Sequence, residues 1–274
     1  DSMKVYRRMD IGTAKPSAAA RAEVPHHCID LVEPSESFSA ARYVQHADRA
    51  IEAIADDDDV PLAVGGTTLY LRALIEGLFE GPPADAALRA ELRQRARREG
   101  LPALHAELAA VDPVAAGRIH PNDEKRIIRA LEVHRRTGRA ISELQSQWDA
   151  QRRYDCLLLG LRRERADLHG RINRRAERMI AAGLADEVAA LLGAPAGLSP
   201  QAAAAVGYAE MIEHLRGERT REDTCEQIKI HTRRLAKKQR TWQRRLPNVH
   251  WFDVAAGETA DALAERVLKE VPIP

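Results

Sequence analysis

The chain has 274 residues and 45% hydrophobic content, enough to fill the core of one large domain or two modest ones. Its 42 Lys and Arg residues nearly balance 41 Asp and Glu residues, so net charge alone predicts no nucleic-acid partner. Cys28, Cys156 and Cys225 are widely spaced, which argues against a disulfide framework or zinc knuckle and favours a cytoplasmic protein. No apolar run approaches the roughly 20 residues that cross a bilayer.

The chain opens on DSMKVYRRMDIGTAKP, which has the character of the middle of a motif. An aspartate is an unusual first residue, because removal of the initiator methionine favours small second residues. We therefore expect further residues upstream of Asp1 in the natural protein.

Short apolar runs with β-branched or aromatic residues predict strands at 60–66, 154–161 and 248–254, and more weakly at 26–32. The run at 60–66 follows four aspartates that we interpret as a solvated loop, and it is expected to be buried. Long helical patterns lie between these runs. This alternation predicts an α/β fold with a mostly parallel sheet flanked by helices.

From Pro82 the pattern becomes purely helical, with leucines recurring at near-helical spacing among many arginines. The sequence therefore predicts a helical insertion domain at 82–151. Residues 1–81 and 152–274 would form the α/β core domain, with LLGAPAGLSP as a linker in its second half.

The stretch VPLAVGGTTLYLRALIEG predicts a strand that turns through two glycines and two threonines into a helix. Such a turn presents hydroxyls and backbone N–H groups at the carboxyl edge of a parallel sheet, where α/β proteins bind ligands. Thr67 is well placed to contact a substrate there. An ordinary helix cap made by the threonines fits the same pattern equally well.

The run HTRRLAKKQRTWQRR contains seven Lys or Arg residues and no acidic residue, which is typical of a surface that follows phosphates. In a helix, one face would carry Ile228, Leu235 and Trp242 for packing, and another would carry Arg233, Lys237, Arg240 and Arg244. We interpret it as a nucleic-acid-binding helix, with a solvated amphipathic helix as the alternative.

Two further patterns are less specific. HPND at 120–123 is a helix start, and it places Arg126 and Arg129 on one helical face, which suits exposed surface as well as binding. His26, His27 and Cys28 invite a metal site, but adjacent side chains diverge and no fourth ligand is near in sequence. We expect a packed or hydrogen-bonded role for them.

Six stretches occur in the order found in one family. They are DSMKVYRRMDIGTAKP, VPHHCIDLVEPSESFSAARY, GGTTLYLRALIEGL, VDPVAAGRIHPNDEKRIIRALEV, AVGYAEM and TRRLAKKQRTW. Together they resemble the bacterial tRNA dimethylallyltransferases, also called tRNA isopentenyltransferases, over nearly the whole chain. The resemblance implies a P-loop-kinase-like sheet with a helical insertion that grips the anticodon stem. In the family a Walker-type glycine loop precedes the DSxxVY motif, and that loop is not in this sequence.

The resemblance also implies the reaction. A dimethylallyl group passes from dimethylallyl diphosphate to the exocyclic amine of the adenine 3′-adjacent to the anticodon of tRNA, with Mg²⁺ as helper. The implied partners are tRNA, through its anticodon stem-loop, and dimethylallyl diphosphate. No membrane partner is implied, and we expect a monomer.

Carried over position by position, the resemblance implies site residues of three kinds. Asp1 matches the general base, which accepts a proton from the adenine amine, and Thr67 matches a hydroxyl near that amine. Thr13 and Lys15 match positions near the diphosphate. The implied tRNA-binding residues are Ser2, Met3, Lys4, Asp85, Lys125, Arg126, Arg129, Arg233, Lys237, Gln239, Arg240 and Arg244.

The chain departs from the family pattern just before Gly207, where Ala204 stands in place of a common Gln or Arg that would clamp diphosphate. Two other functions remain open from the sequence. One is a tRNA-binding module without catalysis, and the other is a transferase that prenylates a free adenine nucleotide. The helical insertion and the basic helix argue against the second, because a mononucleotide needs neither.

Overall fold

The computed structural model describes residues 1–79, 81–145 and 152–271, so the ends of the predicted insertion (146–151) and of the chain (272–274) lie outside the described residues. The chain divides into two compact units. Unit 1 contains Asp1–Leu74 and Asp155–Pro274, and unit 2 contains Ile75–Tyr154. No helix in the described ranges is long and apolar enough to cross a membrane.

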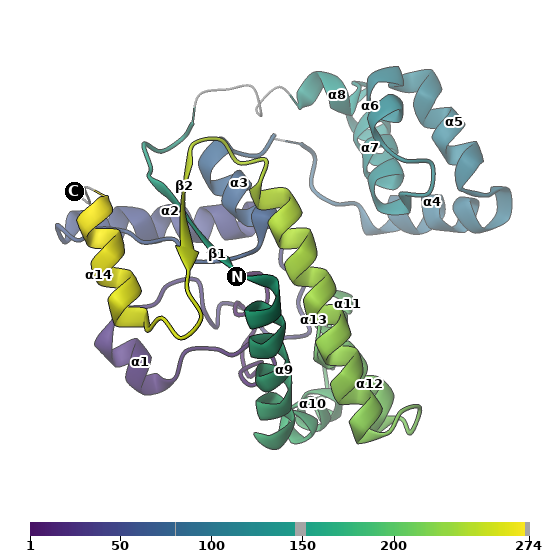
Figure 1. Ribbon diagram of the computed structural model, residues 1–274. Coiled ribbons are helices and arrows are strands. Elements are labelled where there is room, and N and C mark those ends of the chain that lie inside the picture. The colour runs from purple at the N-terminus through teal and green to yellow at the C-terminus, as the bar shows by residue number, and fades with distance from the viewer. Residues whose placement is uncertain (80, 146–151, 272–274) are drawn as a thin grey trace. The chain divides into compact units, whose positions relative to one another are not determined.

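Unit 1 holds the strands and the longest helices (Figure 1). Its elements are α1 (Ala18–Glu23), α2 (Ala40–Asp56), the first part of α3 (Thr68–Glu76), β1 (Leu158–Arg163), α9 (Arg165–Ala181), α10 (Leu184–Gly193), α11 (Pro200–Ala203), α12 (Tyr208–Leu215), α13 (Arg221–Gln243), β2 (Val249–Val254) and α14 (Ala260–Glu270). The strands β1 and β2 pair in parallel, with Leu158 opposite Val249. The prediction of a parallel α/β arrangement is confirmed for this pair.

Two of the predicted strands are wrong. Residues 60–66 form no strand, and Leu62 and Val64 are 80% and 78% exposed instead of buried. A strand needs a neighbour for its backbone groups and a cover for its side chains, and the described residues place neither beside this run. At 26–32 the pairing is reduced to one parallel bridge between Tyr6 and Val32.

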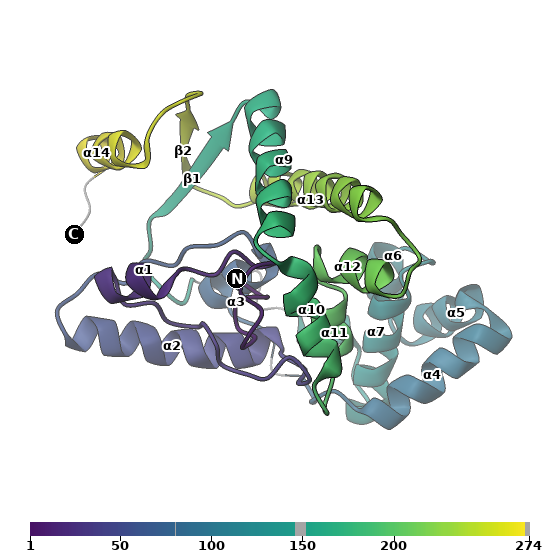
Figure 2. The same ribbon diagram turned by 90° about the horizontal axis from the view of Figure 1, so that it is seen from below.

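The core of unit 1 depends on helix packing more than on the sheet. Helices α9 and α13 run side by side (Figure 1), and α10 lies next to α12 (Figure 2). Tyr43 of α2 stacks on Tyr70 of α3 with ring centroids 4.5 Å apart, and burial raises the pKa of each phenol to about 12. Tyr208 and Met211 of α12 and Ile228 of α13 are also buried.

Unit 2 is helical throughout its described part. It consists of the end of α3, α4 (Ala86–Glu99), α5 (Leu101–Val111), α6 (Pro113–Arg118), α7 (Glu124–Thr137) and α8 (Ile141–Leu144). Leu92, Leu104 and Leu108 are fully buried with Ile127 and Leu131, as the leucine spacing predicts. Asp123 caps α7 by accepting a hydrogen bond from the Arg126 N–H at 3.2 Å, which confirms the predicted helix start.

Glu132 is the polar centre of unit 2, and its side chain is fully buried. It accepts hydrogen bonds from Arg89 at 2.9 and 2.8 Å, from the Asp85 N–H at 2.7 Å and from Arg129 at 2.6 Å. Burial alone would raise the pKa of this carboxyl, but these bonds outweigh burial and lower the pKa to about 2. The carboxylate therefore joins α4 to α7.

We expect Glu132→Gln to lower the free energy of unfolding by about 3 kcal/mol near pH 7, because it leaves two arginines with a weaker partner. The native pKa lies below the usual 4.5, so the contribution is complete above about pH 4.5 and fades as the pH falls toward 2. Denaturant unfolding at several pH values measures the difference between the two proteins. The control Glu143→Gln removes an exposed carboxylate and should change stability by under about 0.5 kcal/mol. A constant difference down to pH 2 would contradict this account.

Candidate functional site

The first residues of the chain lie against the turn that starts α3. The Ser2 N–H donates a hydrogen bond to the Thr67 hydroxyl at 3.2 Å. The Thr67 hydroxyl in turn donates to the Ser2 hydroxyl, also at 3.2 Å. Asp1 is exposed and accepts a hydrogen bond from the Met3 N–H at 2.8 Å. The predicted catalytic residues Asp1 and Thr67 therefore lie on either side of Ser2. Within the described part of the chain, the Thr67 hydroxyl hydrogen-bonds to Ser2 and does not cap α3.

The same turn contacts the basic helix α13. A Cβ added to Gly66 would lie 2.4 Å from the Gln239 amide nitrogen, so the absence of a side chain lets Gln239 approach the turn closely. Gly65 lies near the backbone nitrogen of Asp1. Gln239, predicted to bind tRNA, thus joins the cluster formed by Asp1, Ser2 and Thr67, which we call the Asp1 cluster.

Lys15 and Thr13 are both engaged in structural contacts. The Lys15 side chain is 1% exposed, and its ammonium contacts Asp10 at 2.5 Å, Asp30 at 2.7 Å and the Tyr6 carbonyl at 2.8 Å. The buried Thr13 hydroxyl donates to the Met9 carbonyl at 2.7 Å. The geometry favours a role in holding the loop, so their assignment to the diphosphate stays a prediction that these contacts do not support.

Glu187 and Tyr208 hold the loop that contains Thr13, and sequence reasoning missed both. The Glu187 carboxylate accepts hydrogen bonds from the backbone N–H groups of Asp10, Ile11 and Gly12 at 3.0, 2.8 and 3.3 Å. It also accepts the Tyr208 hydroxyl at 2.5 Å, and burial and this bond raise the pKa of Tyr208. Their separation in sequence from the loop left no local signal. The AVGY motif marked only the position of Tyr208.

Lys4 follows the Asp1 cluster and lies among other cations. Its pKa is lowered first by burial and then by the charges of Arg175 and Lys15. Arg175 of α9 donates to the Thr13 carbonyl at 3.4 Å. Met3, the other residue predicted in this segment, is half-buried and accepts the Tyr6 N–H through its carbonyl at 3.3 Å. Lys4 and Arg175 therefore bring positive charge near the exposed carboxylate of Asp1.

The predicted cationic stripe on α13 is exposed for three of its four members, Lys237, Arg240 and Arg244. Arg233 differs, because it is half-buried and donates to the Asn173 amide oxygen of α9 at 2.5 Å. The predicted packing face is wrong in two places. Ile228 is 2% exposed, but Leu235 and Trp242 are 43% and 38% exposed, because α9 covers only the first half of α13 among the described residues.

The predicted tRNA-binding residues of unit 2 behave differently from one another. Lys125 and Arg126 are exposed, and Lys125 lines an open pocket of about 480 Å³ with Arg93 and His120. Arg129 instead bonds Glu132 at 2.6 Å and the Pro82 carbonyl at 3.0 Å. Asp85 caps α4 by accepting the Leu88 N–H at 3.0 Å. The contacts of Arg129 and Asp85 thus support a structural role for both residues. Their tRNA contacts stay predictions.

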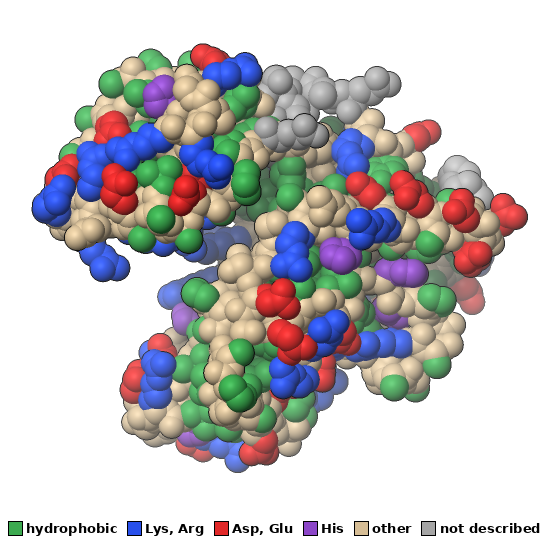
Figure 3. Space-filling model, turned by 180° about the vertical axis from the view of Figure 1, so that it is seen from behind, with side chains coloured by type: hydrophobic (Ala, Val, Ile, Leu, Met, Phe, Trp, Pro, Cys, Tyr) green, Lys and Arg blue, Asp and Glu red, His purple; other side chains and the backbone are tan. Residues whose placement is uncertain are grey.

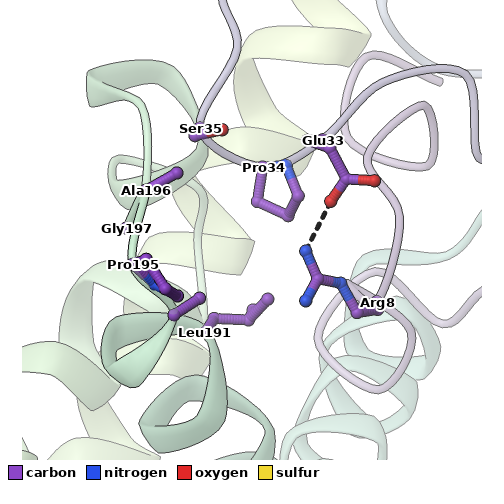
Figure 4. A pocket seen from close by; sticks show the side chains of 9 residues that line it. Arg8, Glu33, Pro34, Ser35, Leu191, Pro195, Ala196 and Gly197 are labelled. Carbon is purple, nitrogen blue, oxygen red and sulfur yellow. Dashed lines mark hydrogen bonds and ion pairs between the residues drawn. The ribbon is translucent and has the colours of Figure 1, made fainter.

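A small pocket of about 190 Å³ in unit 1 contains none of the predicted site residues. Figure 4 shows Pro34, Leu191 and Pro195 around it, with the Arg8 and Glu33 ion pair on one side. Its lining is largely apolar, so we assign it no catalytic role. On the face seen in Figure 3, Lys and Arg side chains lie among Asp and Glu side chains.

The described residues contain no group of three His, Cys, Asp or Glu side chains that could hold a metal ion. His26 uses its ring nitrogen to contact the Val24 carbonyl at 2.6 Å. A Mg²⁺ ion commonly takes one or two carboxylates together with substrate phosphates, and the contacts of the described residues single out no carboxylate for it. We therefore assign no residue to Mg²⁺.

Comparisons with known proteins agree on one family. The family model described as IPP transferase matches residues 4–246. The tRNA dimethylallyltransferase of Geobacter sulfurreducens is 49% identical over 259 residues, which cover 93% of this chain and 83% of that protein. The tRNA dimethylallyltransferase of Anaeromyxobacter dehalogenans strain 2CP-1 is 48% identical over 273 residues, which cover 99% and 88%.

Solved structures give the same result. The tRNA isopentenylpyrophosphate transferase of Bacillus halodurans has a TM-score of 0.69 and 40% identity, covering 98% of this chain and 84% of that chain. A eukaryotic dimethylallyltransferase acting on tRNA has a TM-score of 0.78 and 26% identity, covering 100% and 73%. These neighbours confirm an α/β fold of the P-loop-kinase kind. The chain belongs to the IPP transferase family, which confirms the family predicted from its sequence.

Gly12 tests whether Tyr208 holds the loop. A Cβ at Gly12 would lie 2.4 Å from the Tyr208 ring, and this buried ring has no room to retreat, so Gly12→Ala should lower the free energy of unfolding by about 1–3 kcal/mol. The control Gly193→Ala adds a methyl group that meets nothing within 4 Å, and should change stability by under about 0.5 kcal/mol. Thermal and denaturant unfolding measure both. Equal stability of the two variants would contradict the proposed packing.

Proposed function

We propose that this protein transfers a dimethylallyl group from dimethylallyl diphosphate to N6 of the adenine 3′-adjacent to the anticodon in tRNA. The observation that carries the proposal is the Asp1 cluster, in which an exposed carboxylate and the Thr67 hydroxyl lie beside Gln239 of the basic helix α13. Family membership supports the same reaction, since a relative with 49% identity is named tRNA dimethylallyltransferase.

Asp1 acts as the general base in this proposal. The adenine N6 forms a bond to the allylic carbon while the bond from that carbon to the diphosphate oxygen breaks, and the electron pair leaves with diphosphate. The amine becomes cationic as it attacks, so its proton passes to the Asp1 carboxylate, which is exposed and able to accept it. The Met3 N–H holds this carboxylate through one oxygen at 2.8 Å and leaves the other free.

Thr67 and Gln239 position the base of the substrate. Thr67 is held through Ser2, so its hydroxyl has a defined place beside the carboxylate, and a positioned donor or acceptor orients the reacting amine. Gln239 offers an amide with both donors and an acceptor within reach of the same turn. Such a pair suits the edge of an adenine, which presents both kinds of group.

The leaving diphosphate needs positive charge. A bound Mg²⁺ would neutralise the charge that develops on it, and no step above depends on that ion. Lys4 and Arg175 are the cations beside the Asp1 cluster that carry no carboxylate partner among the described residues. They compensate for Ala204, which is exposed and carries no charge.

The proposal also covers partners and location. The exposed cations of α13 and of Lys125 and Arg126 would contact the anticodon stem-loop. A tRNA substrate places the protein in the cytoplasm, and the three free cysteines suit a reducing compartment. We expect it to work as a monomer.

Incubation of the protein with tRNA, dimethylallyl diphosphate and Mg²⁺ tests the function, with nucleoside mass analysis of the tRNA as the measurement. We expect the added dimethylallyl mass on the adenine next to the anticodon of tRNAs that read codons beginning with U. Asp1→Asn should slow single-turnover chemistry by roughly 10²–10⁴-fold, the usual effect of a positioned base, with tRNA affinity within a few-fold.

The matched control Asp59→Asn removes an exposed carboxylate away from the cluster and should leave the rate unchanged. Binding of tRNA without any mass increase would favour a non-catalytic tRNA-binding module. Modification of free adenine nucleotide but not of tRNA would favour the nucleotide transferase. An unchanged rate in Asp1→Asn would remove Asp1 from the mechanism.

The basic helix gives a separate prediction. Lys237 and Arg240 are exposed, so replacing both by Gln should leave the fold intact, lower tRNA affinity and flatten the slope of log affinity against log salt by about 1 to 2. Filter binding at several salt concentrations measures both quantities. The double variant Arg49→Gln with Lys269→Gln removes the same charge from other exposed positions of unit 1 and serves as the control. A folded variant with wild-type affinity and slope would show that α13 is a solvated helix that does not contact tRNA.

A further inference from the structure

Helix α9 presents a second row of cations that the basic run of α13 does not include. Arg171, Arg174, Arg175 and Arg178 follow i, i+3, i+4 and i+7, so they share one face of the helix, and all four are exposed. The opposite face is apolar, with Ile172, Ala176 and Met179 buried. We call the four residues the α9 arginine face.

None of the four arginines forms an ion pair with a carboxylate among the described residues. Arg175 bonds the Thr13 carbonyl at 3.4 Å, and Arg178 bonds the Arg174 carbonyl at 3.3 Å. The acidic residue within this stretch, Glu177, faces α13 instead and pairs with Lys229 at 2.9 Å. The positive charge of the face is therefore not compensated by the protein.

Several arginines of unit 2 do pair with carboxylates. Arg95 pairs with Glu99 at 3.1 Å and with Glu107 at 2.9 Å, and Arg135 pairs with Glu107 at 3.0 Å. A solvated helix face usually mixes both signs, because like charges at i, i+4 destabilise the helix. On α9 the repulsion between the neighbouring arginines is not offset by a carboxylate on the same face. The pKa of Arg175 is lowered first by desolvation and then by the charge of Arg178.

The α9 arginine face leads to the candidate active segment. Arg175 reaches the loop of Thr13, and its charge acts on Lys4, which follows the Asp1 cluster. On its other side α9 packs along α13 through Asn173 and Arg233 at 2.5 Å (Figure 1). Cations therefore extend from the start of the chain across helices α9 and α13 of unit 1.

We propose that three residues of the α9 arginine face, Arg171, Arg174 and Arg178, bind backbone phosphates of the tRNA substrate, in addition to the surface of α13, while Arg175 serves the diphosphate as proposed above. The inference rests on the proposed function and deepens it. From Arg171 to Arg178 the face extends about 10 Å along the helix axis, and an RNA stem, which is A-form, is recognised largely through its shape, phosphates and 2′-hydroxyl groups. Guanidinium groups match phosphate geometry in bidentate fashion, which suits arginine more than lysine here.

The test replaces Arg171, Arg174 and Arg178 by Gln together and keeps Arg175, which contacts Thr13. Filter binding of tRNA at several salt concentrations should show about a tenfold or greater loss of affinity, and a salt slope reduced by about 2 to 3. The control Arg49→Gln, Arg216→Gln and Lys269→Gln removes the same charge from exposed positions of unit 1 and should leave both unchanged. Circular dichroism checks that each variant is folded.

Unchanged affinity and slope in the folded triple variant would overturn the inference, while prenylation by the wild type would show that the proposed function stands. If the triple variant fails to fold, the single variants Arg174→Gln and Arg178→Gln should each reduce the slope by about one. Unchanged slopes in both single variants would overturn the inference as well.

Discussion

The hydrogen bonds that the Glu187 carboxylate accepts are the interaction on which the first fifteen residues depend. This one group accepts three consecutive backbone N–H groups, of Asp10, Ile11 and Gly12, and a phenol hydroxyl from Tyr208. A carboxylate that accepts this many bonds satisfies backbone donors that a strand or helix would otherwise satisfy. Lys15 completes the arrangement from the other end of the loop through Asp10 and Asp30. The segment is therefore ordered by polar side chains in addition to the backbone hydrogen bonds that join residues 4–7 to residues 30–32.

That ordering explains how an exposed site can have a defined geometry. In the proposed function Asp1 and Lys4 contact a large substrate, and a residue that stays accessible cannot be held by complete apolar burial. Their neighbours Val5, Tyr6 and Met9 are almost fully buried, and the loop after them is tied down by Glu187. The reactive end of the segment projects from an anchored stretch. The basic helices α9 and α13 then supply charge close to it, with Glu177 and Asn173 turned inward to join the two helices.

Local patterns predicted the parts of the fold that local physics determines. The runs that became β1 and β2, the leucine spacing of unit 2 and the Asp123 cap all depend on residues a few positions apart. The run at 60–66 failed, because apolar alternation reports what a strand would bury and not whether a partner lies beside it. The prediction that Leu235 and Trp242 are packed was wrong for a related reason. Helical spacing does not reveal how far the neighbouring helix α9 extends.

The predictions for the site also divide into residues that the sequence could identify and contacts that it could not. The resemblance supplied Asp1, Ser2, Thr67 and Gln239, and the structure places these four at one turn. It could not show that Lys15, Thr13 and Arg129 are engaged by carboxylates or carbonyls, because that depends on side chains brought together by folding. Glu187 and the arginines of α9 were missed for the same reason. Their significance comes from what they contact, or from the carboxylates they lack.

The contacts of Glu187 also set an order of events during synthesis of the chain. It lies 177 to 175 residues beyond the three N–H groups that it accepts, so this loop cannot close until most of the polypeptide has emerged. Unit 2 spans Ile75–Tyr154 and needs only its own contiguous residues, so it can fold while the first segment still waits. The segment that contains Asp10, Ile11 and Gly12 is therefore synthesised well before the carboxylate that holds it.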